Sequence, residues 1–251
     1  MDKSEERLRS RLTDLADEAD KRGIVTFSDF LNLNELNIFH GMAGMLSFVR
    51  WEVSGGYELA ERQIIAFIPD ALYYDWEFPI ACLKISPLRD KFAEDLTHRD
   101  YLGTILGLGL DRSKLGDIFV KNHDAWVFCS ESIADFICRE LTRVRHTSVL
   151  CERTGTPGTD IAVQTESIQG SVASIRLDSL IAMACKGSRS SLCSMIEMGK
   201  VFVNGKLITS NGYVPKEQDV ISVRGIGKFR YSGILSQTKK GRYYIEIQKF
   251  V

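Results

Sequence analysis

The feature that most constrains the fold is a pair of short apolar repeats that run into an alternating stretch. The first repeat comprises Leu177, Leu180, Ile181 and Ala184. The second repeat comprises Leu192, Met195, Ile196 and Gly199. Lys186-Gly187 separates the two repeats, and Ser188 is expected to cap the second. Because this spacing lines one face of a helix, the sequence predicts two short helices in succession.

A small sheet is expected to follow these helices. The spacing changes to strand alternation at Val201-Phe202-Val203, and Asn204-Gly205 is typical of a tight hairpin turn. The further strands are expected at 220–224, 228–235 and 243–248. Two helices packed on this sheet define a domain over 174–251.

Charge divides the chain near the same point. Residues 174–251 hold 13 lysines and arginines against 5 aspartates and glutamates, a net charge of +8, whereas the preceding residues carry −9. This division is typical of a basic module that binds polyanions, and the alternative is a basic segment that only aids solubility. The free backbone N–H groups at Ser188 and the start of the second helix offer a phosphate seat. The cations expected along this edge are Arg176, Lys186, Arg189, Lys200 and Lys206.

The same segment resembles the RNA-binding domain first seen in ribosomal small-subunit protein four, the S-four domain. The residues that carry the resemblance are Arg176-Leu177-Asp178, Ser188-Arg189-Ser190, 199–205 and 219–223. The resemblance implies that the two helices and the following loop grip folded RNA by its backbone and shape. By position it implicates Arg176, Lys186, Arg189, Ser190, Lys200 and Lys206 in RNA binding. It gives architectural roles to Asp178, Gly199, Asn204, Gly205 and Asp219.

The section at 76–165 has the expected element order of a ferredoxin-like (RRM-like) domain. The expected strands and helices are 80–85, 97–106, 118–120, 125–129, 132–144 and 147–151. Strand, helix, hairpin, helix, strand is the split β-α-β order. Many RNA-binding domains share this fold, but so do unrelated proteins, and the order alone does not assign a function.

This middle section offers two kinds of candidate RNA contact. Arg99 and Arg112 flank the glycine-rich end of a helix and are candidates for phosphate contacts, although Arg99 beside Asp100 also suits a structural pair. Trp126 and Phe128 share one side of a strand. They could stack on bases, but aromatics that alternate on a strand are more often core.

The N-terminal segment, 1–75, is expected to contain two helices and two strands, which makes the whole chain α+β. The first helix is expected over 4–21, and Asn34 is expected to cap the second. Strands are expected at 48–53 and 63–68. Residues 153–171 are rich in glycine, proline, threonine and serine and are expected to form a loop and inter-domain connection.

A wider resemblance, to the bacterial YlmH family, covers most of the chain. It rests on Gly55-Gly56-Tyr57, Ala60-Glu61-Arg62, 98–103, 106–109, Arg112, Gly116-Asp117-Ile118 and 224–229. Family membership implies a cytosolic RNA-binding protein that associates with the large ribosomal subunit. It also implies a role in rescuing stalled nascent chains attached to tRNA, so rRNA and peptidyl-tRNA are the expected partners. The family's gene is historically grouped with cell division.

Two other classes of function are alternatives to a non-catalytic RNA binder. An RNA-modifying enzyme or its accessory would need a catalytic motif, and the aspartate of Arg176-Leu177-Asp178 lies within the expected binding helix. A protein-interaction scaffold linked to cell division would leave the basic domain without a purpose. We expect no enzyme activity, no DNA partner and no cofactor.

The remaining composition favours a cytoplasmic protein without a metal or membrane site. The 6 cysteines form no CxxC pair and none lies at ligand spacing from a histidine, so we expect reduced, mostly buried thiols and no metal. The longest uncharged apolar stretch, 101–110, is far shorter than a membrane span requires. The acidic N-terminus argues against a transit peptide.

Overall fold

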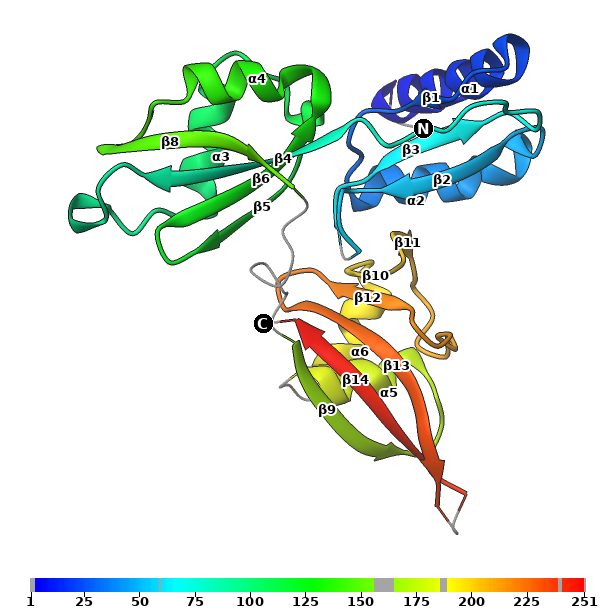
Figure 1. Cartoon of the computed structure of the whole chain (residues 1–251). Helices are drawn as coiled ribbons and strands as arrows, with labels where there is room; N and C mark the ends of the chain where they lie inside the picture. Colours follow the sequence, from blue (N-terminus) through cyan, green and yellow to red (C-terminus); the bar gives the residue numbers. More distant parts are fainter. Residues whose placement is uncertain (1–2, 59, 156–164, 186–188, 239–240, 251) are drawn as a thin grey trace. The chain divides into compact units, whose positions relative to one another are not determined.

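The computed structural model describes residues 3–58, 60–155, 165–185, 189–238 and 241–250 (Figure 1). The chain forms two compact units, the first unit Met1–Ile161 and the second unit Ala162–Val251. Both units combine helices with antiparallel sheets, as the α+β expectation requires. Lys186 and Ser188 lie outside the described residues.

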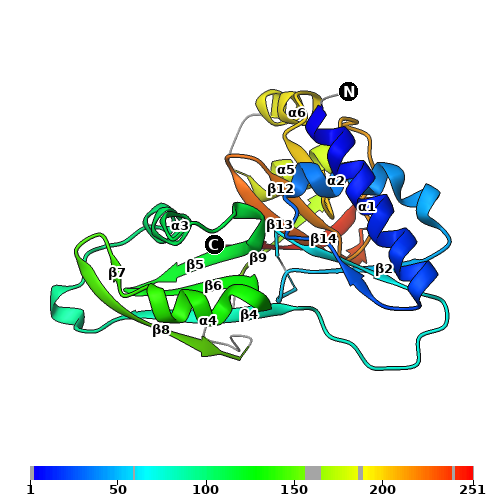
Figure 2. The same ribbon diagram turned by 90° about the horizontal axis from the view of Figure 1, so that it is seen from above.

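The first part of the first unit is a small sheet covered by two helices. Its elements are α1 (Lys3–Arg22), β1 (Thr26–Phe27), α2 (Leu33–Met42), the 3-10 helix η1 (Ala43–Leu46), β2 (Arg50–Ser54) and β3 (Ile64–Ile68). The strand order is β1-β3-β2, and α1 and α2 lie side by side (Figure 2). Their shared core includes Leu12, Phe39 and Phe67.

The cap of α2 corrects one expectation. Asn32, rather than Asn34, is the N-cap, and its side chain accepts hydrogen bonds from the backbone N–H groups of Asn34 and Glu35. The Glu35 carboxylate in turn accepts from Asn32 N at 2.7 Å. This reciprocal pair is a capping box, and it fixes the helix start two residues earlier than the apolar pattern predicted.

The second part of the first unit has a five-stranded sheet with the order β5-β6-β4-β8-β7. Helices α3 and α4 share a core with one face of this sheet, around Leu83, Val127 and Ile137. The expected order of strand, helix, hairpin, helix and strand is present. The elements are β4 (Ile80–Pro87), η2 (Asp90–Phe92), α3 (His98–Gly107), η3 (Arg112–Lys114), β5 (Leu115–Lys121), β6 (Asp124–Ser130), α4 (Glu131–Glu140), β7 (Arg143–Val144) and β8 (Thr147–Thr154).

Helix α4 is shorter than expected. It ends at Glu140, because Arg143 and Val144 pair with Ser148 and Thr147 as the short strand β7. The turn between these strands contains Arg145 with φ of 49°. The prediction of a helix reaching residue 144 was therefore wrong at its last turn, where strand pairing replaces helical hydrogen bonds.

The other face of this sheet carries a small aromatic cluster. Trp126 is 7% exposed and Phe128 is 2% exposed, and both pack with Cys82. Tyr57 packs against Phe128 with ring centroids 5.1 Å apart. The core interpretation of Trp126 and Phe128 is the one that the structure bears out, because a base cannot stack on rings already covered.

The second unit is a six-stranded sheet with two helices against it. The strand order is β11-β10-β12-β13-β14-β9, and α5 and α6 share a core with one face, around Leu180, Ile196 and Ile245. The elements are β9 (Thr165–Val172), α5 (Leu177–Ala184), α6 (Arg189–Glu197), β10 (Val201–Val203), β11 (Lys206–Leu207), β12 (Val220–Val223), β13 (Gly227–Gln237) and β14 (Tyr243–Phe250). The two helices and the strands expected after them are confirmed.

Strand β9 was not expected. It pairs along its whole length with β14, from Val172 opposite Tyr243 to Thr165 opposite Phe250. The expectation that residues 153–171 form only a loop is therefore wrong for 165–171, and also for 153 and 154, which belong to β8. Although the segment is rich in polar residues, its backbone groups find partners in a strand that lies far along the sequence.

All six cysteines are unbridged, and four of them are buried, as expected. The sulfurs of Cys138 and Cys151 lie 3.6 Å apart. Across the described ranges, no helix combines the length and apolar character needed to cross a membrane. The same residues contain no group of three or more potential metal ligands.

Candidate nucleic-acid interface

The candidate site in the second unit is built around the short strand β10. Asn204 and Gly205, with φ of 48° and 79°, form the tight turn that connects β10 to β11. The Asn204 side chain donates to Asp219 at 2.8 Å and accepts from Val220 N at 2.9 Å. Asp219 also accepts from Lys216 N at 2.8 Å. These bonds fix the hairpin, so the architectural roles expected for Asn204 and Asp219 agree with the structure.

Lys200 and Arg224 lie together at the start of β10. Gly199 has φ of 69° and ends α6, with Lys200 N bonded to Met195 O at 3.0 Å in a Schellman arrangement. Arg224 N donates to Lys200 O at 2.9 Å, and its guanidinium lies 5.0 Å from the centre of the Phe202 ring. Both cations are exposed.

Lys206 lies beyond the other end of β10, as the first residue of β11. It follows the Asn204-Gly205 turn, pairs with Val203 and is exposed. Because β10 has only three residues, the strand and its two turns present Lys200, Lys206 and Arg224 within a short span. The arrangement leaves these charges accessible to a phosphate backbone.

Arg176 forms an ion pair at the start of its own helix. It is the N-cap residue of α5, and its Nε donates to Asp178 at 3.1 Å. Asp178 is 8% exposed and also accepts from Ser179 N at 2.9 Å. The Arg176 charge is therefore partly neutralised, and the pair supports the start of the helix.

The rest of the expected edge lies at the start of α6. Arg189 and Ser190 open this helix, and the structure describes their backbone there. Lys186 and Ser188 precede it outside the described residues. The phosphate seat expected at this helix start stays a prediction.

Sequence reasoning missed three cations of the second unit. Arg224 follows β12, and Lys228 and Arg230 lie on β13 opposite Ser222 and Val220. On β13 their neighbours Phe229 and Tyr231 face the helix-covered core. Since side chains alternate along a strand, the buried aromatic pair indicated that Lys228 and Arg230 face the opposite side.

In the first unit, Arg99 and Arg112 lie in different surroundings. Arg99 is exposed in the first turn of α3. Arg112 is half-buried, and its Nη1 donates to Leu115 O at 2.6 Å and to Gly116 O at 3.2 Å. Burial, with Arg62 nearby, lowers the pKa of Arg112 to about 10. Arg112 therefore holds its own loop, whereas Arg99 is available to solvent.

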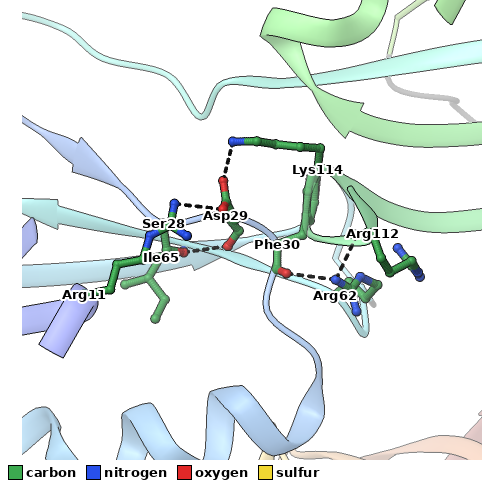
Figure 3. A network of polar contacts seen from close by, with 8 residues as sticks. All are labelled: Arg11, Ser28, Asp29, Phe30, Arg62, Ile65, Arg112 and Lys114. Atoms are coloured by element: carbon green, nitrogen blue, oxygen red, sulfur yellow. Dashed lines mark hydrogen bonds and ion pairs between the residues drawn. The ribbon is translucent and has the colours of Figure 1, made fainter. Parts of the chain in front are cut away.

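Arg62 joins three segments of the first unit (Figure 3). Its Nε donates to Leu115 O at 2.8 Å, and its Nη2 donates to Phe30 O at 2.9 Å and to Arg112 O at 3.2 Å. Burial lowers the pKa of Arg62, and this cost is offset by the three carbonyl acceptors. The guanidinium thus fastens the segment between β1 and α2 to η3 and to the start of β5.

Two further contacts strengthen this junction. Lys114 Nζ lies 2.6 Å from Asp29, and Arg11 lies 2.8 Å from the same carboxylate (Figure 3). Asp117 accepts from Tyr57 Oη at 2.6 Å and from Glu61 N at 2.7 Å. The junction therefore pairs each of its two carboxylates with several donors.

Three of the motifs that carry the wider sequence resemblance meet at this junction. Tyr57, Arg62 and Asp117 come from three of those motifs and share hydrogen bonds. Gly56 has φ of 90°, and a Cβ built there would lie 2.5 Å from the Phe128 ring. These three motifs are explained by packing inside the first unit, so they are not evidence of a catalytic or binding site.

Comparison with known proteins adds three findings. A family model described as "Putative RNA-binding domain in YlmH" matches residues 75–156. The "Ribosome-associated protein quality control protein P2" of Bacillus subtilis (strain 168) is 30% identical over 224 residues, which is 88% of this chain and 86% of that protein. The solved structure "Cell division protein ylmH from Streptococcus pneumoniae" has a TM-score of 0.51 and 21% identity, covering 64% of this chain and 96% of that chain. The last similarity is one of fold.

Proposed function

The chain belongs to the YlmH family, and on that premise we propose that it is a non-catalytic protein that binds structured RNA. We further propose that it acts in ribosome-associated quality control, as the name of the Bacillus subtilis relative says of that protein. Its targets would be rRNA and peptidyl-tRNA on the large ribosomal subunit, and its location the cytoplasm, where translating ribosomes work.

The observation that carries the RNA proposal is the exposure of Lys200, Lys206 and Arg224 around one three-residue strand. Two helices on a small sheet, with a Schellman turn and an Asn-Gly hairpin before and after β10, support assignment of the second unit to the S-four type. A rigid turn at each end of the strand holds the cations in a fixed arrangement. Fixed cations suit folded RNA, whose backbone phosphates also have defined positions.

The second part of the first unit is proposed as a ferredoxin-like RNA-binding domain. Its four long strands lie across the sheet in the order β5, β6, β4 and β8, and β7 is added at the edge beside β8. Numbered by their order along the chain, these four strands are the second, third, first and fourth. This order, with both helices on one face, supports the ferredoxin-like assignment. Arg99 remains a candidate phosphate contact there, whereas the carbonyl partners of Arg112 favour a structural role for it.

The proposed absence of catalysis rests on the one aspartate that resembles a catalytic motif. Asp178 is 8% exposed and is bonded to Arg176 and Ser179. A carboxylate held in this way cannot approach a nucleotide without breaking the start of α5. Incubation with rRNA, followed by analysis of modified nucleosides, should give no product.

The test of the RNA proposal is a pair of double charge reversals in the full chain. Lys200→Glu with Lys206→Glu should weaken binding to ribosomes and to an rRNA fragment by roughly 100-fold at moderate salt. The slope of log K against log salt should flatten by about two units, since two phosphate contacts are lost. Cosedimentation and a salt titration by gel shift give both quantities.

The matched control is Arg7→Glu with Arg50→Glu. Both arginines are exposed in the first unit, and the net charge changes by the same amount. The control should bind with nearly the affinity of the wild type. If the control lost binding and the second-unit variant kept it, the proposed interface would be wrong.

A further inference from the structure

A separate hollow of about 370 Å³ lies in the first unit. It is formed between the segment after β4 and the β7–β8 turn. The lining residues are Leu88, Arg89, Phe92, His146, Thr147 and Ser148. None of these residues belongs to the candidate sites described above, and the volume is within the range of small-ligand pockets.

The walls of the hollow are fixed by hydrogen bonds between its two segments. Leu88 N donates to Ser148 O at 2.9 Å, and Glu94 N donates to Thr147 Oγ1 at 3.1 Å. The Glu94 carboxylate accepts from His146 N at 2.9 Å. Because hydrogen bonds join the two segments, the hollow exists before any ligand arrives, and ligand binding carries no free-energy cost for forming it.

The apolar residues of the hollow are unusually open to solvent. Leu88 is 60% exposed and Phe92 is 67% exposed. Lys91 lies 5.9 Å from the centre of the Phe92 ring, so one cation accompanies the aromatic surface. An exposed ring with an adjacent cation suits a flat, electron-rich ligand better than an aliphatic one.

Three exposed cations, Arg89, Lys91 and Arg143, accompany the hollow. Arg143 is the cross-strand partner of the lining residue Ser148. The cations are therefore available on the rim.

Two of the nearby carboxylates are engaged by other residues. Asp100 pairs with Arg145 at 2.7 Å, and the Glu94 carboxylate accepts a hydrogen bond from His146 N. Asp90 and Asp95 lie 3.5 and 3.7 Å from the imidazole of His123, and their side chains are exposed. Around the hollow, exposed cations therefore lie next to an open aromatic ring.

We propose that this hollow binds an unpaired RNA base, with the base stacked on Phe92 and the adjoining phosphate held by Arg89, Lys91 or Arg143. The inference rests on the proposed RNA-binding function and adds a site for single-stranded RNA to it. An acidic peptide would also meet the cations, but it would leave the Phe92 ring face without a planar partner. The family model described as an RNA-binding domain spans 75–156, which includes every lining residue.

The test uses the full chain and two fluorescent RNA probes: a hairpin with a uridine loop, and the same stem as a blunt duplex. Phe92→Ala should weaken binding to the looped hairpin by roughly 10-fold, the effect of losing one base–aromatic stack, and leave binding to the duplex unchanged. Phe92→Trp should retain the affinity for the loop. Tyr73→Ala is the matched control, because Tyr73 is an aromatic residue that is 93% exposed outside the hollow.

The outcomes separate this inference from the proposed function. If the wild type binds both probes and Phe92→Ala binds them equally well, the base site is refuted and the RNA-binding proposal stands. An equal loss of affinity for both probes would also refute the base site. So would a Phe92→Ala protein that keeps its affinity for RNA but loses affinity for an acidic peptide. If the wild type binds neither these probes nor ribosomes, the proposed function itself fails, and the base site fails with it.

Discussion

The two units use their cations in opposite ways. In the first unit, Arg62 and Arg112 turn inward and donate to backbone carbonyls of Phe30, Leu115 and Gly116. In the second unit, Lys200 and Lys206 point into solvent, and the neighbouring turns are held by the uncharged Asn204 with Asp219. The comparison shows that a cation beside a glycine turn can either stabilise the fold through backbone carbonyls or remain available to contact a ligand. The distinction depends on which acceptors the fold brings within reach.

The largest expected effect tests the inward arginine. Arg62→Ala removes a partly buried guanidinium and its three hydrogen bonds to backbone carbonyls, and we expect the free energy of unfolding of the first unit to fall by about 3 kcal/mol. Denaturation followed by tryptophan fluorescence measures this change. Arg99→Ala is the control, because Arg99 is exposed, and it should change stability by less than about 0.5 kcal/mol. Equal effects of the two substitutions on stability would contradict the structural role assigned to Arg62.

The second effect concerns the uncharged framework of the second unit. Asn204→Ala removes the bonds to Asp219 and Val220 and puts alanine at φ of 48°. We expect a loss of about 2 kcal/mol and a weaker affinity for RNA, since Lys206 depends on this turn for its position. Asn204→Gly, which tolerates the backbone angle, should recover part of the stability. Unchanged RNA affinity in a destabilised Asn204→Ala protein would show that the turn does not orient Lys206.

Arg112 gives a smaller effect that sharpens the contrast. Arg112→Ala loses two carbonyl partners on a half-buried side chain, and we expect a loss of about 1 kcal/mol in stability. The affinity for RNA, measured by gel shift at a temperature where the variant is folded, should stay the same. A flatter salt slope for this variant would instead make Arg112 a phosphate contact, as the sequence had suggested.

The smallest effect depends on pH. Hydrogen bonds from Thr97 hold the pKa of Asp100 below its ordinary value, with a further contribution from Arg145. A carboxylate with a lowered pKa in the folded state stabilises fully above its unfolded pKa, and this contribution is lost as pH falls through the folded value. Asp100→Asn should therefore lower Tm slightly at pH 7, and the difference from wild type should shrink below about pH 4. A difference that is independent of pH would mean that packing, not charge, is responsible.

Local patterns made much of the second unit predictable. The helices α5 and α6, the Asn204-Gly205 turn and the strands after it depend on spacing within a few residues. Strand β9 was missed because its evidence is not local: its polar sequence becomes a strand only through pairing with β14. The last turn of the helix expected to reach residue 144 failed for a related reason, since β7 exists through its pairing with β8.

The candidate site was predictable in charge but less so in geometry. The exposure of Lys200 and Lys206 agrees with the expectation from charge patterning. The partners of Arg112 could not be foreseen, because backbone carbonyls have no signature in the sequence. The hollow at Phe92 also escaped prediction, since its second wall comes from the β7–β8 turn more than 50 positions later. Spacing identifies helix faces, but it does not identify which loops meet.

The pairing of β9 with β14 has a consequence for the timing of synthesis. Arg242, which directly precedes β14, donates a hydrogen bond to Ser171 O, 71 positions earlier in the sequence. Helices α5 and α6 are synthesised between these two residues. During translation, β9 therefore emerges long before its neighbour exists. Contacts of such high sequence separation form slowly, and an unpaired strand edge is prone to wrong associations. We expect the first unit to fold early and the second to complete its sheet only after β14 emerges, so the pace of elongation through this stretch sets how long β9 stays unprotected.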